Sequence, residues 1–140
     1  MRAATPPVEV AMLNRDPDDR SRQMVFAPDL IQVPSGSTVR FLPVDRGHNT
    51  ASTRGMLPEG AEAWQSSLNA PYDVILTVEG TYGYHCTPHL SMGMVGLILV
   101  GDPSSNFEAS RKVRHRGRAA DRYAELFARA EALLEMPGAG

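Results

Sequence analysis

A chain of 140 residues, 42% of them hydrophobic, is long enough for one compact domain and too short for two ordinary domains. Its formal net charge of −2 argues against a protein built around nucleic-acid phosphates, which would carry a basic face. The single cysteine, Cys86, excludes an internal disulfide, and no apolar run approaches the ~20 residues that span a bilayer. We therefore expect one domain, no nucleic-acid partner and no membrane insertion.

Short runs of Val, Ile, Leu, Phe and Tyr are separated by many of the 12 glycines and 11 prolines, a pattern that favours an all-β body. In chain order, the predicted strands cover residues 8–13, 24–26, 30–33, 38–44, 73–78, 81–86 and 94–100. About seven or eight short strands separated by turn signals indicate a β-sandwich or a barrel.

Two connections between these strands have recognisable patterns. Residues 45–69 predict a long loop that contains a short helix near residues 61–64. Glu79 and Gly80 separate two strand-like runs, and that spacing predicts a tight β-hairpin.

The chain changes character after Gly101. Ser105 and Glu108 have the spacing of a capping box, which predicts the start of a short helix. Between residues 118 and 135, apolar residues repeat at spacings of three and four and predict a second helix that packs on the sandwich. Its apolar stripe consists of Ala120, Tyr123, Phe127, Ala130 and Leu134. The basic run 111–118 is expected to be a solvated connector between the two helices.

These patterns divide the chain into four segments. We expect a disordered N-terminal segment over residues 1–7, the sandwich over 8–101, a helical extension over 102–136 and a tail over 137–140. The first seven residues lack the apolar middle of a signal peptide.

Sulfur and nitrogen donors gather in one short predicted loop. Cys86, His89 and Met94 fall between two strands, and His48 lies far upstream beside Gly47. Taken singly, each has an ordinary structural explanation, such as a small buried thiol or a gap-filling methionine. Together they form the His₂Cys set with a weak axial methionine that suits copper in electron transfer. Either Met92 or Met94 is close enough in the sequence to complete it.

Around these donors the chain resembles the cupredoxins and, within them, the pseudoazurins. The matching positions are Glu9, Val10, Met12, Leu13, Asn14, Met24, Val25, Phe26, Pro43, Val44, Asp45, Gly47, His48, Asn49, residues 58–62, Cys86, Thr87, Pro88, His89, Met92, Gly93 and Met94. The resemblance runs from about Val8 into the C-terminal helices. It implies a Greek-key β-sandwich of about eight strands with two C-terminal α-helices.

The resemblance also implies a function. Such a protein is a soluble blue-copper electron carrier that cycles between Cu(II) and Cu(I) in the bacterial periplasm. It holds one copper ion, acts as a monomer, and typically serves nitrite reductase or nitrous oxide reductase in denitrification. Carried over residue by residue, the ligands are His48, Cys86, His89 and Met94, which leaves Met92 on the rim.

Three further residues are expected to support the metal. Asn49 is placed to tie the two ligand loops together, and its backbone N–H is a candidate donor to the Cys86 sulfur. Pro88 has no N–H, which should leave the thiolate electron-rich and favour Cu(II). By the resemblance, Met24 lies against the ring of His89.

The resemblance brings electrons out through His89, inside an apolar collar for which the candidates are Pro43, Pro88, Leu90 and Met92. Pseudoazurins usually ring this collar with lysines, and the only lysine of this chain is Lys112. We expect Arg15, Arg46 and Arg54 to keep part of a positive rim. His85, where a lysine is common, should point away from the metal and lie at the surface.

Three other functions compete. A copper enzyme domain needs a second metal site, and only two histidines remain after the ligands are assigned. A copper delivery or storage protein would favour several cysteines or a methionine-rich tract. A cysteine hydrolase would need a nucleophile and a base, and the spacing from Cys86 to His89 and Met94 fits metal chelation better.

Overall fold

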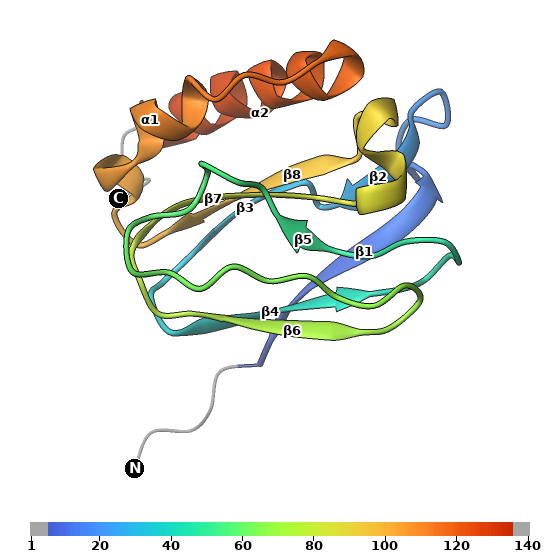
Figure 1. Ribbon diagram of the computed structural model, residues 1–140, viewed down its shortest axis with the longest axis horizontal. Coiled ribbons are helices and arrows are strands. Elements are labelled where there is room, and N and C mark those ends of the chain that lie inside the picture. The colour runs from blue at the N-terminus through green and yellow to red at the C-terminus, as the bar shows by residue number, and fades with distance from the viewer. Residues whose placement is uncertain (1–5, 136–140) are drawn as a thin grey trace.

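Eight strands form two sheets in the computed structural model, which describes residues 6–135 (Figure 1). The first sheet has the order β2-β1-β4-β6 and the second the order β3-β8-β7-β5. Their bounds are β1 Val8–Arg15, β2 Gln23–Ala27, β3 Leu30–Val33, β4 Ser37–Leu42, β5 Ala51–Ser52, β6 Tyr72–Leu76, β7 Gly80–His85 and β8 Val95–Val100. The predicted eight-stranded sandwich is confirmed. Residues 1–5 of the expected disordered segment, and the whole tail 137–140, lie outside the described residues.

The alternation of buried and exposed side chains explains how the first sheet packs against the core. In β4, Val39 and Phe41 point into the core and are fully buried, whereas in β6 Ile75 faces outward and is 67% exposed. Strand β8 has no such alternation, and all six of its residues are buried. Ile98 packs in the core between the sheets, and Leu97 packs in a second core beneath the helices. An apolar strand without alternation therefore indicates that both of its faces are covered.

Two local predictions in the middle of the chain were wrong. Glu79 and Gly80 do not form a hairpin, because β6 pairs with β4 in the first sheet while β7 pairs with β5 and β8 in the second. No helix forms near residues 61–64: the Ser52 N–H donates to the carbonyl of Trp64 over 2.9 Å in an extended pairing. Trp64 is buried in the core, which holds this segment against the sandwich.

The C-terminal extension contains a short 3-10 turn and two helices, as the resemblance implied. These are η2 (Pro103–Ser105), α1 (Phe107–Arg111) and α2 (Gly117–Glu135). The capping-box prediction was wrong: Asn106 occupies the N-cap of α1, and its amide binds the backbone of Thr81 instead. No helix of the described residues is long and apolar enough to cross a membrane.

Helix α2 lies over the outer face of the second sheet (Figure 1). Its buried residues are Ala119, Tyr123, Leu126, Phe127 and Ala130. The predicted stripe is therefore correct at three positions, whereas Ala120 is only half-buried and Leu134 is exposed. The connector at residues 112–116 runs between the helices with its lysine and both arginines exposed.

Candidate metal centre

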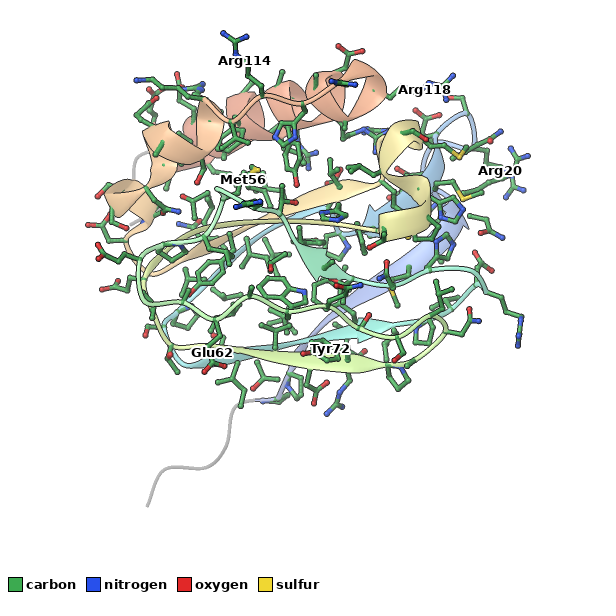
Figure 2. The ribbon with its side chains drawn as sticks, in the orientation of Figure 1. Arg20, Met56, Glu62, Tyr72, Arg114 and Arg118 are labelled. Atoms are coloured by element: carbon green, nitrogen blue, oxygen red, sulfur yellow. The ribbon has the colours of Figure 1, made fainter. Side chains whose placement is uncertain are left out.

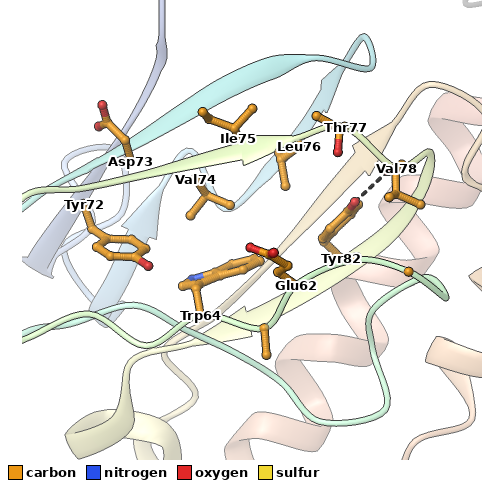
Figure 3. Close-up of a pocket in the computed structure, with 13 residues that line it drawn as sticks. Glu62, Trp64, Tyr72, Asp73, Val74, Ile75, Leu76, Thr77, Val78 and Tyr82 are labelled. Carbon is orange, nitrogen blue, oxygen red and sulfur yellow. Dashed lines mark hydrogen bonds between the residues drawn. The ribbon is translucent and has the colours of Figure 1, made fainter.

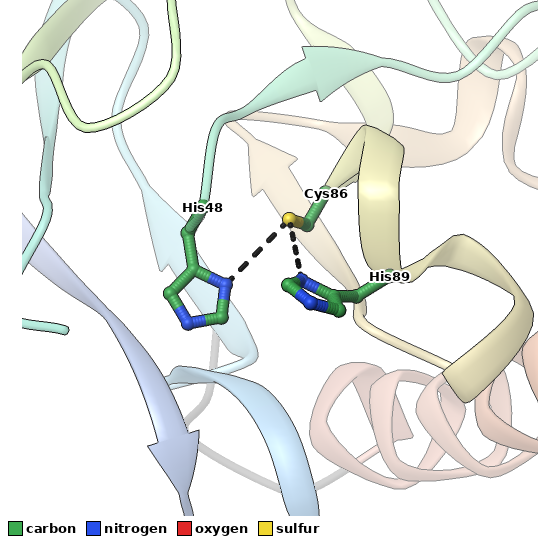
Figure 4. A group of neighbouring side chains, drawn as sticks. All are labelled: His48, Cys86 and His89. Carbon is green, nitrogen blue, oxygen red and sulfur yellow. Dashed lines mark hydrogen bonds between the residues drawn. The ribbon is translucent and has the colours of Figure 1, made fainter. Parts of the chain in front are cut away.

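Three donor side chains from segments far apart in the sequence meet at one end of the sandwich (Figure 4). The Nδ1 atoms of His48 and His89 lie 3.7 and 3.4 Å from the Sγ of Cys86. His48 lies in the loop after β4, Cys86 follows β7 directly, and His89 lies in the 3-10 turn η1 (Thr87–Met92). The three donors predicted from the sequence therefore lie together in the structure.

The turn η1 folds the ligand loop back on itself. Pro88 occupies its first turn, and the N–H of His89 donates to the carbonyl of Cys86 over 3.1 Å. Gly93 ends the turn with a left-handed φ of 84°, a conformation that favours glycine. The carbonyl of Met94 then accepts from the N–H of Cys86 over 2.9 Å. Met94 is fully buried in the same core cluster as Cys86, while Met92 remains partly exposed.

The tautomer of His48 follows from its hydrogen bond to Asn14. The Nε2 of His48 lies 2.8 Å from the Oδ1 of Asn14, and an amide oxygen can only accept. Nε2 therefore carries the proton, which leaves the lone pair of Nδ1 free to bind a metal beside Cys86. No role for Asn14 follows from the sequence, because nothing there connects it to a histidine 34 positions away.

The electrostatics of the cluster favour a bound cation. Burial raises the pKa of the Cys86 thiol, and the backbone N–H groups of Asn49 and His89 partly oppose that rise. Burial and the charge of His89 lower the pKa of His48, so its ring favours the neutral form that ligates metals. A buried thiolate needs positive charge beside it, which a metal ion would supply.

The donor set also fits copper by its chemistry. Metal bonds of about 2.0–2.3 Å to nitrogen and sulfur, at angles between tetrahedral and trigonal, would separate the donors by roughly 3.6–3.8 Å. The two sulfur-to-nitrogen distances, 3.4 and 3.7 Å, are close to that range. Blue-copper centres use this set of ligands: two imidazoles, one thiolate and a nearby methionine.

Asn49 joins the loops that carry His48 and Cys86. Its buried side chain accepts a 2.7 Å hydrogen bond from the N–H of Thr87 and donates to the Thr87 hydroxyl over 3.2 Å. It also donates to the carbonyl of Ser66 over 3.3 Å. Met24 is half-buried in β2, a strand that contacts η1; its contact with the His89 ring stays a prediction.

The predicted collar has an exposed part and a half-buried part. Pro88 is exposed and Leu90 is 36% exposed, whereas Pro43, Met92 and His89 itself are half-buried. Arg15, Arg46 and Arg54 are all exposed. The connector also contributes: Arg114 and Arg116 line a cavity of about 570 Å³ together with Pro88 and Leu90. The basic run predicted to be only a connector thus adds positive charge beside the ligand loop.

His85 points away from the metal donors, as predicted, but it is less exposed than expected, because α2 covers this part of β7. His85 is half-buried, and its Nδ1 lies 2.8 Å from the Oγ1 of Thr53. The same Oγ1 lies 2.8 Å from the hydroxyl of Tyr123, which donates to the carbonyl of Tyr84 over 2.8 Å. Tyr123 has one proton and donates it to Tyr84, so Thr53 must donate to Tyr123 and accept from Nδ1–H of His85. Side-chain hydrogen bonds thus join α2 to β7, the strand directly before Cys86.

Replacing Tyr123 by phenylalanine should remove this junction without opening a large cavity. We expect the unfolding free energy to fall by about 1–3 kcal/mol, because Thr53 and the Tyr84 carbonyl lose a buried partner. We also expect the proton of His85 to redistribute between its ring nitrogens, which ¹⁵N NMR of the imidazole would detect. Phe127, which packs beside Tyr123 without a hydroxyl, offers Phe127→Leu as a control that perturbs packing only. An unchanged His85 tautomer in Tyr123→Phe would contradict the proton assignment.

Comparisons with known proteins agree with this geometry. Residues 14–101 match the model for copper binding proteins of the plastocyanin/azurin family. A pseudoazurin of Methylorubrum extorquens is 40% identical over 126 residues, covering 90% of this chain and 83% of that protein. A pseudoazurin of Paracoccus pantotrophus is 40% identical over 114 residues, covering 81% and 77%.

Solved structures give the same answer. A pseudoazurin structure from Sinorhizobium matches with a TM-score of 0.86 and 40% identity over 90% of this chain and 97% of that one. The native pseudoazurin of Hyphomicrobium denitrificans matches with a TM-score of 0.82 and 33% identity over 89% and 98%. A His₂Cys cluster beside a buried methionine, on a sandwich with this helical extension, thus has its counterparts among copper proteins. The chain belongs to the plastocyanin/azurin family of copper-binding electron-transfer proteins, and within it to the pseudoazurins.

Proposed function

We propose that this copper electron carrier holds one ion with His48, Cys86, His89 and Met94 and delivers single electrons to a periplasmic redox enzyme. Nitrite reductase and nitrous oxide reductase are the acceptor classes that we propose. The observation that carries the proposal is the convergence of two Nδ1 atoms on the single thiol, at 3.7 and 3.4 Å.

The protein's part in the reaction is to keep its donors still. Copper, when bound, supplies the one-electron couple between Cu(II) and Cu(I). His48 is held by Asn14, and Cys86 lies in a loop whose backbone is bonded to Met94 and to Asn49. Donors fixed in this way would change position little between oxidation states, which keeps electron transfer fast.

His89 offers a route from the donors to the surface. Its Nδ1 faces Cys86 and its ring is half-buried, among the exposed Pro88 and Leu90. An apolar rim around such an exit suits close and brief docking, since electron-transfer interfaces are small.

The rival functions have less support. Among the described residues, His48, Cys86 and His89 form the only group of three or more His, Cys, Asp or Glu side chains that could hold a metal. The second metal of a copper enzyme therefore has no cluster of such residues in this part of the chain. One cysteine and scattered methionines also provide little for a protein that stores or delivers copper.

A visible spectrum recorded while Cu(II) is added tests the metal site. We expect an intense blue absorption from the thiolate-to-copper transition that saturates at one ion per chain, and a reversible one-electron wave in voltammetry. A colourless protein that binds Cu(II) elsewhere would contradict the proposal.

Replacing Pro88 by alanine should raise the reduction potential. Residue 88 would gain an N–H two positions after Cys86, and a hydrogen bond from it to the thiolate would withdraw electron density and favour Cu(I). Voltammetry of the copper-loaded variant checks this, with Ser91→Ala as a control on the exposed side of the same turn. An unchanged or lowered potential would remove the argument.

Docking should depend on salt through the positive rim. We expect the second-order rate of electron transfer to an acidic nitrite reductase to fall as salt is added, because charges are screened over about 10 Å at 0.1 M. Arg46→Gln should lower both the rate at low salt and its salt dependence. Arg40→Gln is the matched control, since Arg40 is paired with Asp73 at 2.9 Å. An electron-transfer rate that does not change with salt concentration would exclude electrostatic steering.

A further inference from the structure

Three arginines line a cavity of about 320 Å³ between helix α2 and the residues that precede β2. Arg22 comes from the loop, and Arg118 and Arg122 come from the first two turns of the helix. Met92 of the ligand loop lines the same cavity. Arg118 is labelled at this end of the helix (Figure 2).

Two of these guanidinium groups have N–H donors without an acceptor. The Nη2 atom of Arg22 and the Nη1 atom of Arg122 are buried and have no hydrogen-bond partner among the described residues. Arg22 pairs with Glu125 at 3.3 Å through its other terminal nitrogen, and its Nη2 is 4.0 Å from Asp29. Buried donors of this kind cost free energy unless an acceptor reaches them.

Like charges meet in this cavity. Burial, and next the charge of Arg22, lower the pKa of Arg122, so the two cations lie near enough to repel each other. The acids that only partly oppose this lowering of the pKa are Glu125, Asp29 and Asp16. The lining contains three arginines and two acids, Asp121 and Glu125, which leaves a net charge of +1. Glu125 is already engaged by Arg22 at 3.3 Å and Arg129 at 3.8 Å. Water could accept the free hydrogen bonds, and an anion would accept them and also reduce the repulsion between the two guanidinium groups.

We propose that this cavity binds a small tetrahedral oxyanion of the phosphate or sulfate class, held by Arg22, Arg118 and Arg122. Guanidinium groups present paired donors that match oxyanion oxygens, and donors from two separate elements suit a tetrahedral ion better than a planar carboxylate. A bound ion would bridge α2 and the loop before β2. The site contains none of the metal donors, so a test of anion binding is independent of the test for copper binding.

Inorganic phosphate is the probe that tests the site. The full chain with copper bound is titrated with phosphate against chloride at matched ionic strength, and calorimetric binding and the thermal unfolding midpoint are recorded. We expect saturable binding of one phosphate and a midpoint that rises with phosphate concentration, as ligand linkage requires. Arg122→Gln and Arg118→Gln should each weaken binding by about tenfold or more.

Two controls make the result decisive. Arg40→Gln removes an arginine that pairs with Asp73 at 2.9 Å on the first sheet and does not line the cavity, and it should leave the dissociation constant unchanged. Acetate should bind more weakly than phosphate. Equal responses to phosphate and chloride, or full binding by both Arg122→Gln and Arg118→Gln, would overturn the proposal. Tighter binding of acetate than of phosphate would overturn the choice of a tetrahedral ion.

Discussion

Replacing Cys86 by serine is expected to abolish the blue absorption of the copper-loaded protein. The absorption requires a thiolate bound to the metal, and Cys86 is the only cysteine of the chain. A hydroxyl binds copper poorly, so we also expect the Cu(II) affinity to fall by several orders of magnitude. The measurement is a visible spectrum during Cu(II) titration, with a competing chelator to report the dissociation constant.

The two methionines of the ligand loop give a matched control for this experiment. Met94 is fully buried beside Cys86, whereas Met92 is half-buried at the rim. Met92→Leu should therefore keep both the colour and the potential, while Met94→Leu should keep the colour but shift the potential upward, since an axial ligand tunes it. Blue absorption that survives in Cys86→Ser would refute the proposed ligand set, and an unchanged potential in Met94→Leu would remove Met94 from it.

The donors that share one loop were predictable because their spacing is local. Cys86, His89 and Met94 sit within one turn and its exit, so the sequence alone brings them close together. Spacing alone could not predict that His48 lies near Cys86. This contact requires strands β4 and β7, which belong to two different sheets, to end at the same edge of the sandwich. The family resemblance supplied that long-range information.

The predictions that failed depended on partners distant in the sequence. A hairpin between β6 and β7 matches the local pattern, but hydrophobic periodicity does not say which sheet a strand joins. Alternation along β7 predicted correctly that His85 points away from the metal. It could not predict that a helix more than 30 residues further along the chain covers this face. Tyr123 covers that face by hydrogen bonding to Tyr84 over 2.8 Å.

The pocket in Figure 3 also forms between segments that are distant in the sequence, so local sequence patterns do not predict it. It lies between the loop at residues 60–64 and the free edge of β6, and it has a volume of about 440 Å³. Trp64 and Tyr82 stack at 6.4 Å inside it, and the hydroxyl of Tyr82 donates to the carbonyl of Val78. None of the copper donors lines it. Its aromatic residues are core residues of the sandwich, so the depth of the hollow reflects packing at an open sheet edge.

Asn49→Ala is expected to have the largest effect on stability among the variants considered at the metal centre. The change removes three side-chain hydrogen bonds, including the 2.7 Å bond from the N–H of Thr87, and leaves that donor without its acceptor. We expect the unfolding free energy to fall by roughly 2–4 kcal/mol, measured by urea denaturation of the metal-free protein. Because Asn49 lies between His48 and the loop of Cys86, copper affinity should also fall by about 10–100-fold.

Asn69→Gly is the matched control for this variant, because Asn69 has a left-handed φ of 64° that would strain an alanine. Asn69 also accepts a short hydrogen bond from a ligand loop, 2.6 Å from the N–H of Gly47, but its side chain is exposed to water. Water can replace the lost acceptor there, so we expect a loss of less than about 1 kcal/mol and little change in copper affinity. The contrast isolates burial as the cause, because both asparagines bond to a backbone N–H beside a metal donor. Equal losses in the two variants would mean that Asn49 acts as an ordinary loop residue and that the two ligand loops are held together by packing alone.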